Sequence, residues 1–401
     1  MEHQTFTLPD HVKQEQVVDF DMNHVNALHE DIHLGLNAIY SQVPDIFYTL
    51  HNGGHWVVKG FDMVRRVTMD SEHFSTAEID IPKVPSENKL IPLNLDPPDH
   101  APYRAMLLKH FSAKTVAALE PTLRAWAARL IEQARPDGGC DFTENLGAGF
   151  PVSVFMEMMG LPMDRFAEFR EIVTEYFEQI TPERRRELQE IIVGEVEALI
   201  EARRAEPRDD LISHLVQERV RDRLLTQKEL NSICFLLVIA GLDTVANMLT
   251  FSTYHLARNA ELQARLHADP SLVPAFVEEC LRRYAVVNAA RMVKKDIEID
   301  GYQFRAGEMV MCALPAAGLD PRKNDSPETF SLDRENRAVM PFSAGPHLCL
   351  GHFLARAEMR VFFEEWTRRI PRFDVAPGFT PDYRVGFVMA IPSLPLKWQP
   401  G

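Results

Sequence analysis

The hydrophobic and polar positions of this chain repeat with two periods, and each period predicts a different kind of element. Between residues 114 and 258 apolar side chains recur at helical spacing, interrupted at turns that contain glycine or proline. Residues 47–58 and 297–304 instead alternate around short turns that contain glycine, which predicts two β-hairpins. Residues 385–396 also predict short strands. The pattern therefore indicates a mainly helical protein with small β-sheets.

Residues 226–258 carry the strongest helical pattern in the chain. Thr226 and Glu229 form a capping-box pattern at its start, and no proline follows up to residue 258. At about 1.5 Å per residue, an unbroken helix would be roughly 48 Å long. Residues 233–242 are apolar on every face, so we expect this helix to cross the core. The apolar run is far shorter than the about 20 residues of a membrane span.

Four residues at the end of this apolar run break local rules: Ala240, Gly241, Asp243 and Thr244. Glycine costs about 1 kcal/mol in a helix, and a buried carboxylate must be paired. Taken singly they have structural explanations, since Thr244 can bond the carbonyl of Ala240 and Asp243 can join an ion pair. As a cluster they indicate a ligand site, because small residues admit a ligand while the acid and the alcohol supply protons.

The loop at residues 341–351 places Cys349 where an amphipathic helix is predicted to begin. Unpaired N–H groups at a helix start favour the thiolate form of a cysteine. A thiolate either attacks electrophiles or binds a metal, and His347 could serve a nucleophile as its base. The five cysteines of the chain have neither a CxxC pair nor zinc-ligand spacing. We therefore expect no disulfide framework and no structural zinc site.

Three other segments fit a structural role as well as a functional one. The loop at residues 79–95 is long enough to favour a function over a mere connection. His100 and Arg104 lie four residues apart on the first turns of a predicted helix, where an arginine is ordinarily solvated. Glu279 and Arg282 can pair, which on an exposed helix contributes only about 0.2–0.5 kcal/mol.

Charge and composition narrow the possible functions. Lys plus Arg total 43 and Asp plus Glu total 58, so the net charge of −15 argues against a general nucleic-acid binder. The N-terminus has no basic segment followed by an apolar core, and we expect an unexported protein of the reducing cytoplasm that does not enter the membrane. A length of 401 residues alone would suggest two or three domains.

The motifs together resemble those of the cytochromes P450. Residues 240–244 resemble the oxygen-activating segment of the family's helix I, and Glu279-x-x-Arg282 resembles its helix K pair. The haem-binding loop of the family is matched by Phe342-x-x-Gly345-x-x-x-Cys349-x-Gly351. The likeness covers nearly the whole chain and is closest to the soluble bacterial camphor hydroxylase group. It implies a mainly α fold with small β-sheets, in a single domain over residues 1–401.

This resemblance implies haem b bound between the long helix and the cysteine loop. The Cys349 thiolate would be the iron ligand, and its electron donation would favour O–O cleavage. The haem propionates would be bound by His100, Arg104, Arg291 and His347. The residues close to the macrocycle would be Phe342, Gly345, Gly351, Ala240 and Gly241.

The resemblance also implies a monooxygenase reaction, in which RH, O2, two electrons and two protons give ROH and water. Asp243 and Thr244 would deliver the protons. The proximal side would be braced by Glu279, Arg282 and Arg334.

The electrons must come from outside, because the chain has no GxGxxG fingerprint after a strand and no ferredoxin cysteine spacing. By resemblance the donor is a small acidic 2Fe-2S ferredoxin that an NADH-dependent ferredoxin reductase reduces. A basic landing patch for it is expected near Cys349. Its members would be Arg104, Lys109, Arg337 and Arg356.

The substrate is expected to be compact and hydrophobic. Matching this chain to the camphor hydroxylases through Ile91 and Pro92 places Asn88 where they carry a tyrosine, which disfavours camphor. An apolar pocket wall suits a terpenoid or norisoprenoid, such as an ionone-like ketone. The pocket residues would be Ile79, Asn88, Leu90, Leu236, Ile239, Val287, Phe387 and Val388.

Two rival functions stay open at this point. A peroxide-using hydroxylase or a haem gas sensor with P450 architecture would keep the haem, although a peroxide user does not need a proton relay such as Asp243 and Thr244. A cysteine-dependent hydrolase would use Cys349 with His347, although no oxyanion site is visible in the sequence.

Overall fold

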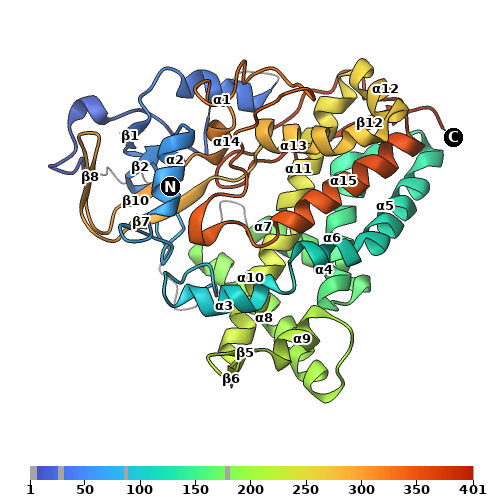
Figure 1. The fold of residues 1–401 in the computed structure, drawn as a ribbon, viewed down its shortest axis with the longest axis horizontal. Helices are drawn as coiled ribbons and strands as arrows, with labels where there is room; N and C mark the ends of the chain where they lie inside the picture. The colour runs from blue at the N-terminus through green and yellow to red at the C-terminus, as the bar shows by residue number, and fades with distance from the viewer. Residues whose placement is uncertain (1–6, 26–30, 85–88, 177–180, 401) are drawn as a thin grey trace.

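The labelled strands of the largest sheet lie on one side of the molecule, and most of the long helices lie on the other (Figure 1). The structure is a computed structural model that describes residues 7–25, 31–84, 89–176 and 181–400. The helices of the first half are α1 (Ile32–Tyr40), α2 (Phe61–Met69), α3 (His100–Leu108), α4 (Ala113–Ala118), α5 (Glu120–Ala134), α6 (Gly149–Met159), α7 (Phe166–Tyr176) and α8 (Pro182–Ala205). The later ones are α9 (Leu211–Gln217), α10 (Gln227–Leu242), α11 (Thr244–Ala257), α12 (Ala260–Ala268), α13 (Val273–Arg283), α14 (Leu314–Ala317) and α15 (His352–Arg369).

The largest sheet joins strands from distant parts of the chain in the order β1-β2-β10-β7-β3. Its strands are β1 (Ile46–Thr49), β2 (His55–Val58), β3 (Phe74–Ser75), β7 (Ala289–Val293) and β10 (Met309–Cys312). β10 runs parallel to β2, with Val310 opposite Trp56. The other pairings in this sheet are antiparallel.

The remaining strands form small antiparallel sheets. β11 (Phe373–Val375), β12 (Pro395–Trp398) and β4 (Gly139–Asp141) form one, and β5 (Arg219–Val220) pairs with β6 (Arg223–Leu224). β8 (Ile297–Ile299) and β9 (Tyr302–Phe304) form a hairpin. Both predicted hairpins, β1–β2 and β8–β9, are therefore confirmed.

The predicted core helix exists but is not continuous. It is divided at Asp243, whose φ of −121° and ψ of −39° lie away from helical values, into α10 and α11. The prediction of an unbroken helix is therefore wrong at this residue. The Thr244 hydroxyl donates to the carbonyl of Ala240, which gives the backbone an alternative to regular helix bonding.

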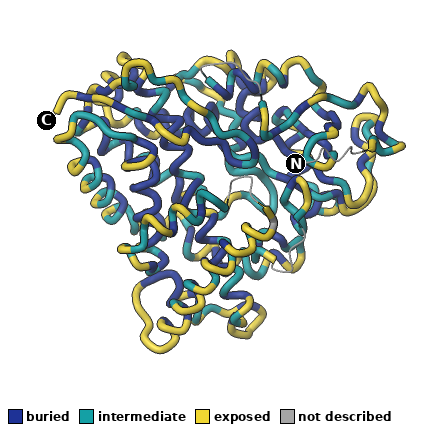
Figure 2. The backbone as a smooth tube through the Cα atoms, turned by 180° about the vertical axis from the view of Figure 1, so that it is seen from behind, coloured by how far each residue is buried: buried dark blue, intermediate teal, exposed yellow. Residues whose placement is uncertain are grey.

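The capping box at the start of α10 is confirmed, since Thr226 and Glu229 bond each other's backbone N–H groups. By length and composition, Gln227–Ala257 could cross a membrane, contrary to the expectation from the shorter apolar run. However, 72% of its most apolar window is buried inside the protein. It is therefore a core helix of the protein, in which buried stretches of backbone gather in the interior and exposed ones at the rim (Figure 2).

α15 packs against α5 and α13 through its apolar side, which includes the fully buried Val361 and Trp366. The helix begins later than predicted, after Gly351, so Cys349 lies in the preceding loop. Phe353 in the first turn of α15 is 41% exposed, and its ring contacts that of His352.

Candidate active site

One face of α10 and α11 is open in an otherwise buried helix. Leu236, Ala240 and Thr244 follow one another at intervals of four residues, so they lie on the same face. Ala240 is exposed and the other two are half-buried, whereas the neighbouring Ile239 and Leu242 are buried. This face can therefore contact a bound group.

Gly241 lies where α10 packs against α6. A Cβ atom at this position would lie 2.5 Å from the ring of Phe155 on α6, which is a clash. The residue must therefore be small for the two helices to approach each other. Helix packing explains this glycine, and its closeness to the macrocycle stays a prediction.

Cys349 lies in the loop before α15. Its backbone N–H donates to the carbonyl of Phe342 at 2.9 Å, which fixes the loop. Its side chain is exposed although it lies deep among protein atoms, so it faces an internal hollow and not the outer surface. Burial raises the pKa of the Cys349 thiol, while the Gly351 N–H, Arg104 and Arg356 act to lower it. These three groups would stabilise a thiolate bound to a cation.

The two glycines of this loop differ in what they require. Gly345 has a φ of +73°, and a Cβ there would lie 2.8 Å from the carbonyl oxygen of Thr68 on α2. Its backbone conformation and this close approach both demand glycine. A Cβ on Gly351 would meet nothing within 4 Å, so packing against described protein atoms does not explain that glycine.

The four predicted propionate ligands come from three segments of the chain, and the two histidines among them are in contact. The rings of His100 and His347 are 4.4 Å apart, and His347 Nε2 lies 3.1 Å from Thr76 Oγ1. Burial, followed by the charges of Arg291, His100 and Arg104, lowers the pKa of His347 to about 3. His347 is therefore neutral near pH 7 and too weak a base to activate Cys349, which disfavours the hydrolase hypothesis.

Arg291 is the strongest sign of an anionic ligand. It is 5% exposed, and its guanidinium donates to the carbonyl of Ala290 at 2.8 Å. Among the described residues no carboxylate lies within ion-pair distance of Arg291 or Arg104. Burial lowers the pKa of both guanidinium groups. Buried cations of this kind need a counter-ion, and the two propionates of a haem would supply it.

Asp243 and Thr244 lie where the core helix divides. Asp243 Oδ2 accepts from Asn247 Nδ2 at 2.9 Å and from the Arg384 guanidinium at 3.2 Å. Burial raises the pKa of Asp243, although Arg384 and Asn247 oppose the shift. The Thr244 hydroxyl lies 3.2 Å from the carbonyl of Ala240. The sequence did not indicate Arg384 as a partner, because 141 residues separate it from Asp243.

Glu279 is the centre of a buried ionic network. Its carboxylate accepts two bonds from Arg282, at 2.7 and 3.0 Å, and one from Arg334 at 3.2 Å. Arg337 contributes a fourth bond at 3.2 Å. Burial alone would raise the pKa of Glu279, but these partners lower it overall. The Glu279 and Arg282 side chains are 0% exposed, so the small value for a pair on an exposed helix does not apply to them.

We expect Glu279→Gln to lower the free energy of unfolding by about 3–5 kcal/mol, because it removes the anion that three buried or half-buried arginines share. Urea-induced unfolding of the holoprotein would measure the change. Glu278→Gln is the matched control: Glu278 pairs with Arg356 at 2.6 Å, but its side chain is 36% exposed. That control should cost about 1 kcal/mol or less. Equal losses in the two variants would contradict the bracing role.

The cations of the predicted ferredoxin landing patch differ in how far they are exposed and paired. Arg337 bonds Glu279 and its side chain is 19% exposed, so its place in the patch stays a prediction. Arg356 pairs with Glu278 and lies 4.7 Å from the centre of the Phe342 ring. Lys109 pairs with Glu218 at 3.2 Å and is 64% exposed. Lys109 is the most exposed of the four predicted cations.

The predicted substrate wall is assembled from distant segments. Val287 and Val388 are paired in an antiparallel bridge, and the Asn288 N–H donates to the carbonyl of Phe387 at 2.8 Å. The loop at residues 89–95 is fastened to α10, since the Ile91 N–H donates to Ser232 Oγ at 2.8 Å. The remaining predicted wall residues that are described, Ile79, Leu90, Leu236 and Ile239, are half-buried or buried. Asn88 lies outside the described residues.

Taken together, an accessible thiol deep in the protein, an open face on the core helix and a set of cations without carboxylate partners among the described residues fit a haem-thiolate oxygenase. The cytochrome P450 family model matches residues 142–381. A probable cytochrome P450 127A1 from Sinorhizobium fredii is 34% identical over 98% of this chain and 97% of its own. The nocardicin C N-oxygenase of Nocardia uniformis is 32% identical, over 92% and 96%. This chain belongs to the cytochrome P450 family.

Solved structures agree with this assignment. The crystal structure of CYP101J2 has a TM-score of 0.91 and 35% identity, over 98% of this chain and 99% of its own. That of CYP101C1 has a TM-score of 0.90 and 32% identity, over 98% and 100%. The predicted mainly α fold with small sheets is confirmed, as is the family. The protein is a P450 monooxygenase, and its cofactor is thiolate-ligated haem b.

Proposed function

We propose that Cys349 is the iron ligand of the haem in this protein. The observation that carries the proposal is a chain of neighbours: the Arg104 charge acts on the Cys349 thiol, and Arg104 and Arg291 both act on His347. The thiolate would be held by the Gly351 N–H, and His100 and His347 would complete the propionate site. When bound, the haem supplies the oxygen-activating chemistry of the family.

On the opposite side, Asp243 and Thr244 would move protons. Asp243 is buried, and its pKa is raised by that burial, so its carboxyl group can hold a proton closer to neutral pH than an exposed aspartate can. Thr244 is half-buried on the open face of the helix and can pass a proton onward through its hydroxyl group. A relay of this kind favours an O2-dependent monooxygenase over a peroxide user or a gas sensor.

The proposed substrate is a compact terpenoid or norisoprenoid ketone, such as an ionone. Its wall would comprise Val287, Phe387 and Val388 on one side and Leu236 and Ile239 on α10. Because these side chains are apolar, they would select a substrate by its shape and would form few hydrogen bonds with it.

The proposed electron donor is a small acidic 2Fe-2S ferredoxin, reduced by an NADH-dependent ferredoxin reductase in the cytoplasm. The exposed Lys109 and the half-exposed Arg356 support a cationic docking face near Cys349, although each has an acidic neighbour. Opposite charges on the two partners would speed their encounter.

A binding screen would test the substrate class. We expect ionones to change the haem spin state at lower concentration than camphor, because the wall is apolar. Turnover with NADH, reductase and ferredoxin should then yield one hydroxylated product per NADH consumed. Omitting ferredoxin is the control. A response to camphor alone, or product formation from peroxide but never from NADH and O2, would contradict the proposed function.

A further inference from the structure

The segment from residue 383 to residue 390 forms a small closed hairpin beside the core helix. Arg384 and Ala390 exchange two backbone hydrogen bonds, each 3.0 Å long. Phe387 and Val388 lie between them, near the tip. The hairpin is tied to the preceding strand region by the Met389 N–H, which donates to the carbonyl of Val286 at 2.8 Å. Only a few residues of hydrogen-bonded backbone therefore separate the tip at Phe387 and Val388 from the base at Arg384 and Ala390.

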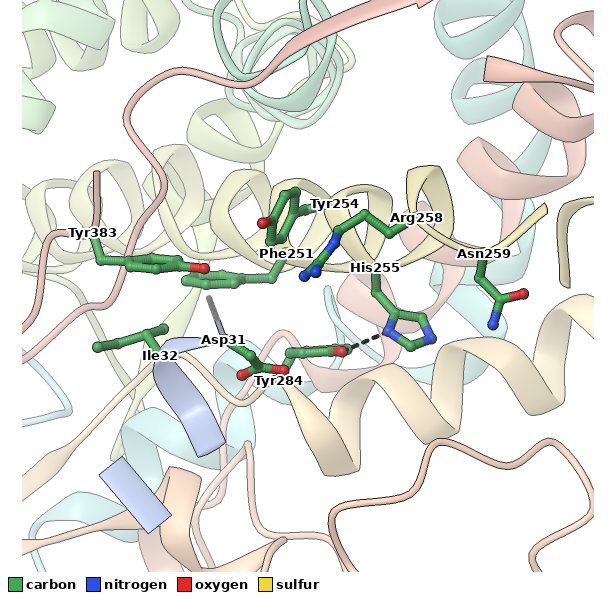
Figure 3. A pocket seen from close by; sticks show the side chains of 9 residues that line it. All are labelled: Asp31, Ile32, Phe251, Tyr254, His255, Arg258, Asn259, Tyr284 and Tyr383. Atoms are coloured by element: carbon green, nitrogen blue, oxygen red, sulfur yellow. Dashed lines mark hydrogen bonds between the residues drawn. The ribbon is translucent and has the colours of Figure 1, made fainter. Parts of the chain in front are cut away.

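The base of this hairpin is anchored on α11. The ring of Tyr383 lies nearly parallel to that of Phe251, with 6.1 Å between centroids and 1° between planes. Figure 3 shows these two rings side by side. Together with Tyr284 and His255 they line a cavity of about 240 Å³. The position of Tyr383 fixes where the next residue, Arg384, enters the site.

The side chain of Arg384 reaches from this base to the catalytic helix. Its guanidinium lies 3.2 Å from Asp243 Oδ2, and both side chains are largely buried, at 20% and 12% exposed. Arg384 Nε is buried and has no hydrogen-bond partner among the described residues. Asp243 is the one carboxylate within ion-pair distance of Arg384 in the described part of the chain.

The surroundings of Asp243 make this contact important. Asn247 on α11 also bonds Oδ2, and the charge of Arg170 on α7 acts from further away. No hydrogen bond from a described residue reaches Oδ1, so that oxygen is available for proton transfer. The position of Arg384 thus affects both the orientation and the ionisation of the carboxyl group.

We propose that Arg384 is a positioning residue that keeps the Asp243 carboxyl group in place, and that a ligand packed on Phe387 and Val388 changes the Arg384–Asp243 contact through the hairpin. The inference rests on the proposed roles of Asp243 and of the hairpin tip. A ligand that packs on the tip moves a closed unit whose base carries Arg384. An apolar ligand has no charge of its own, so it alters Asp243 by moving Arg384 or by displacing water. By linkage, the state of Asp243 alters ligand affinity to the same extent.

Infrared difference spectra of the reduced, carbon-monoxide-bound holoprotein would test this. The carboxyl band of Asp243 is assigned by its loss in Asp243→Asn. Arg384→Met removes the charge while keeping a long side chain, and Arg384→Lys is the matched control. We expect Arg384→Met to shift the protonation equilibrium of Asp243 toward the neutral acid by about tenfold or more. Arg384→Lys should stay near the wild type.

The second measurement adds camphor or β-ionone, whichever gives the larger spin-state change. The carboxyl band should change on binding in the wild type and in Arg384→Lys, and should not change in Arg384→Met. An unchanged wild-type band, or the same change in Arg384→Met, would overturn the coupling. If Arg384→Met does not fold, Arg384→Gln replaces it. A normal carbon-monoxide spectrum in every variant separates failure of this proposal from failure of the Cys349 assignment.

Discussion

Replacing Cys349 by serine should abolish the red-shifted Soret band of the reduced carbon-monoxide complex. The band depends on electron donation from a thiolate to the iron, and a serine oxygen is a poorer donor. Monooxygenase turnover should fall to background for the same reason. Absorption spectra of the purified variant, with a parallel haem assay, would measure both the ligand change and the haem content.

Cys140→Ser is the matched control for this experiment. Cys140 is half-buried in β4, away from the α15 loop, and burial raises the pKa of its thiol to about 12. That variant should keep the red-shifted band. An unchanged band in Cys349→Ser would contradict the iron-ligand assignment and, with it, the placement of the propionate site.

The elements that sequence predicts best here are those with local causes. The turn at Asp300 and Gly301 and the capping box at Thr226 and Glu229 depend on residues close in sequence, and both are found as predicted. The break at Asp243 is different, because its partner Arg384 lies in a distant segment. A contact between residues so far apart in the sequence leaves no periodic pattern of apolar and polar positions by which it could be predicted.

The candidate site shows the same division. The order and spacing of the cysteine loop, the helix K pair and the small-residue segment suffice to identify the family. They do not reveal that Arg337 belongs to the Glu279 network, since a single arginine in a loop has the same appearance whether it is buried or solvated. Nor do they reveal that Gly241 packs against Phe155, which lies on another helix. That all 401 residues form one domain stays a prediction.

Replacing Asp243 by asparagine should lower turnover by about 10²–10³-fold while changing substrate affinity by about tenfold or less. The variant keeps the size of the side chain but removes the carboxyl group that would carry the proton. Affinity should change much less than turnover, because the proposed wall is apolar and does not include Asp243, and only the proposed coupling through Arg384 connects the two. Product formation in the ferredoxin system would measure turnover, and the same assay in D2O would give the solvent isotope effect. A spin-state titration would measure substrate affinity.

Asp382→Asn is the control, because Asp382 is exposed and lies two residues from Arg384 without taking part in the site. It should retain turnover and affinity. An increase of the solvent isotope effect in Asp243→Asn alone would assign the loss to proton transfer, since damage to the fold would lower affinity as well. A loss of affinity equal to the loss of turnover would instead mean that Asp243 acts by shaping the pocket, and the proton-relay role would be wrong.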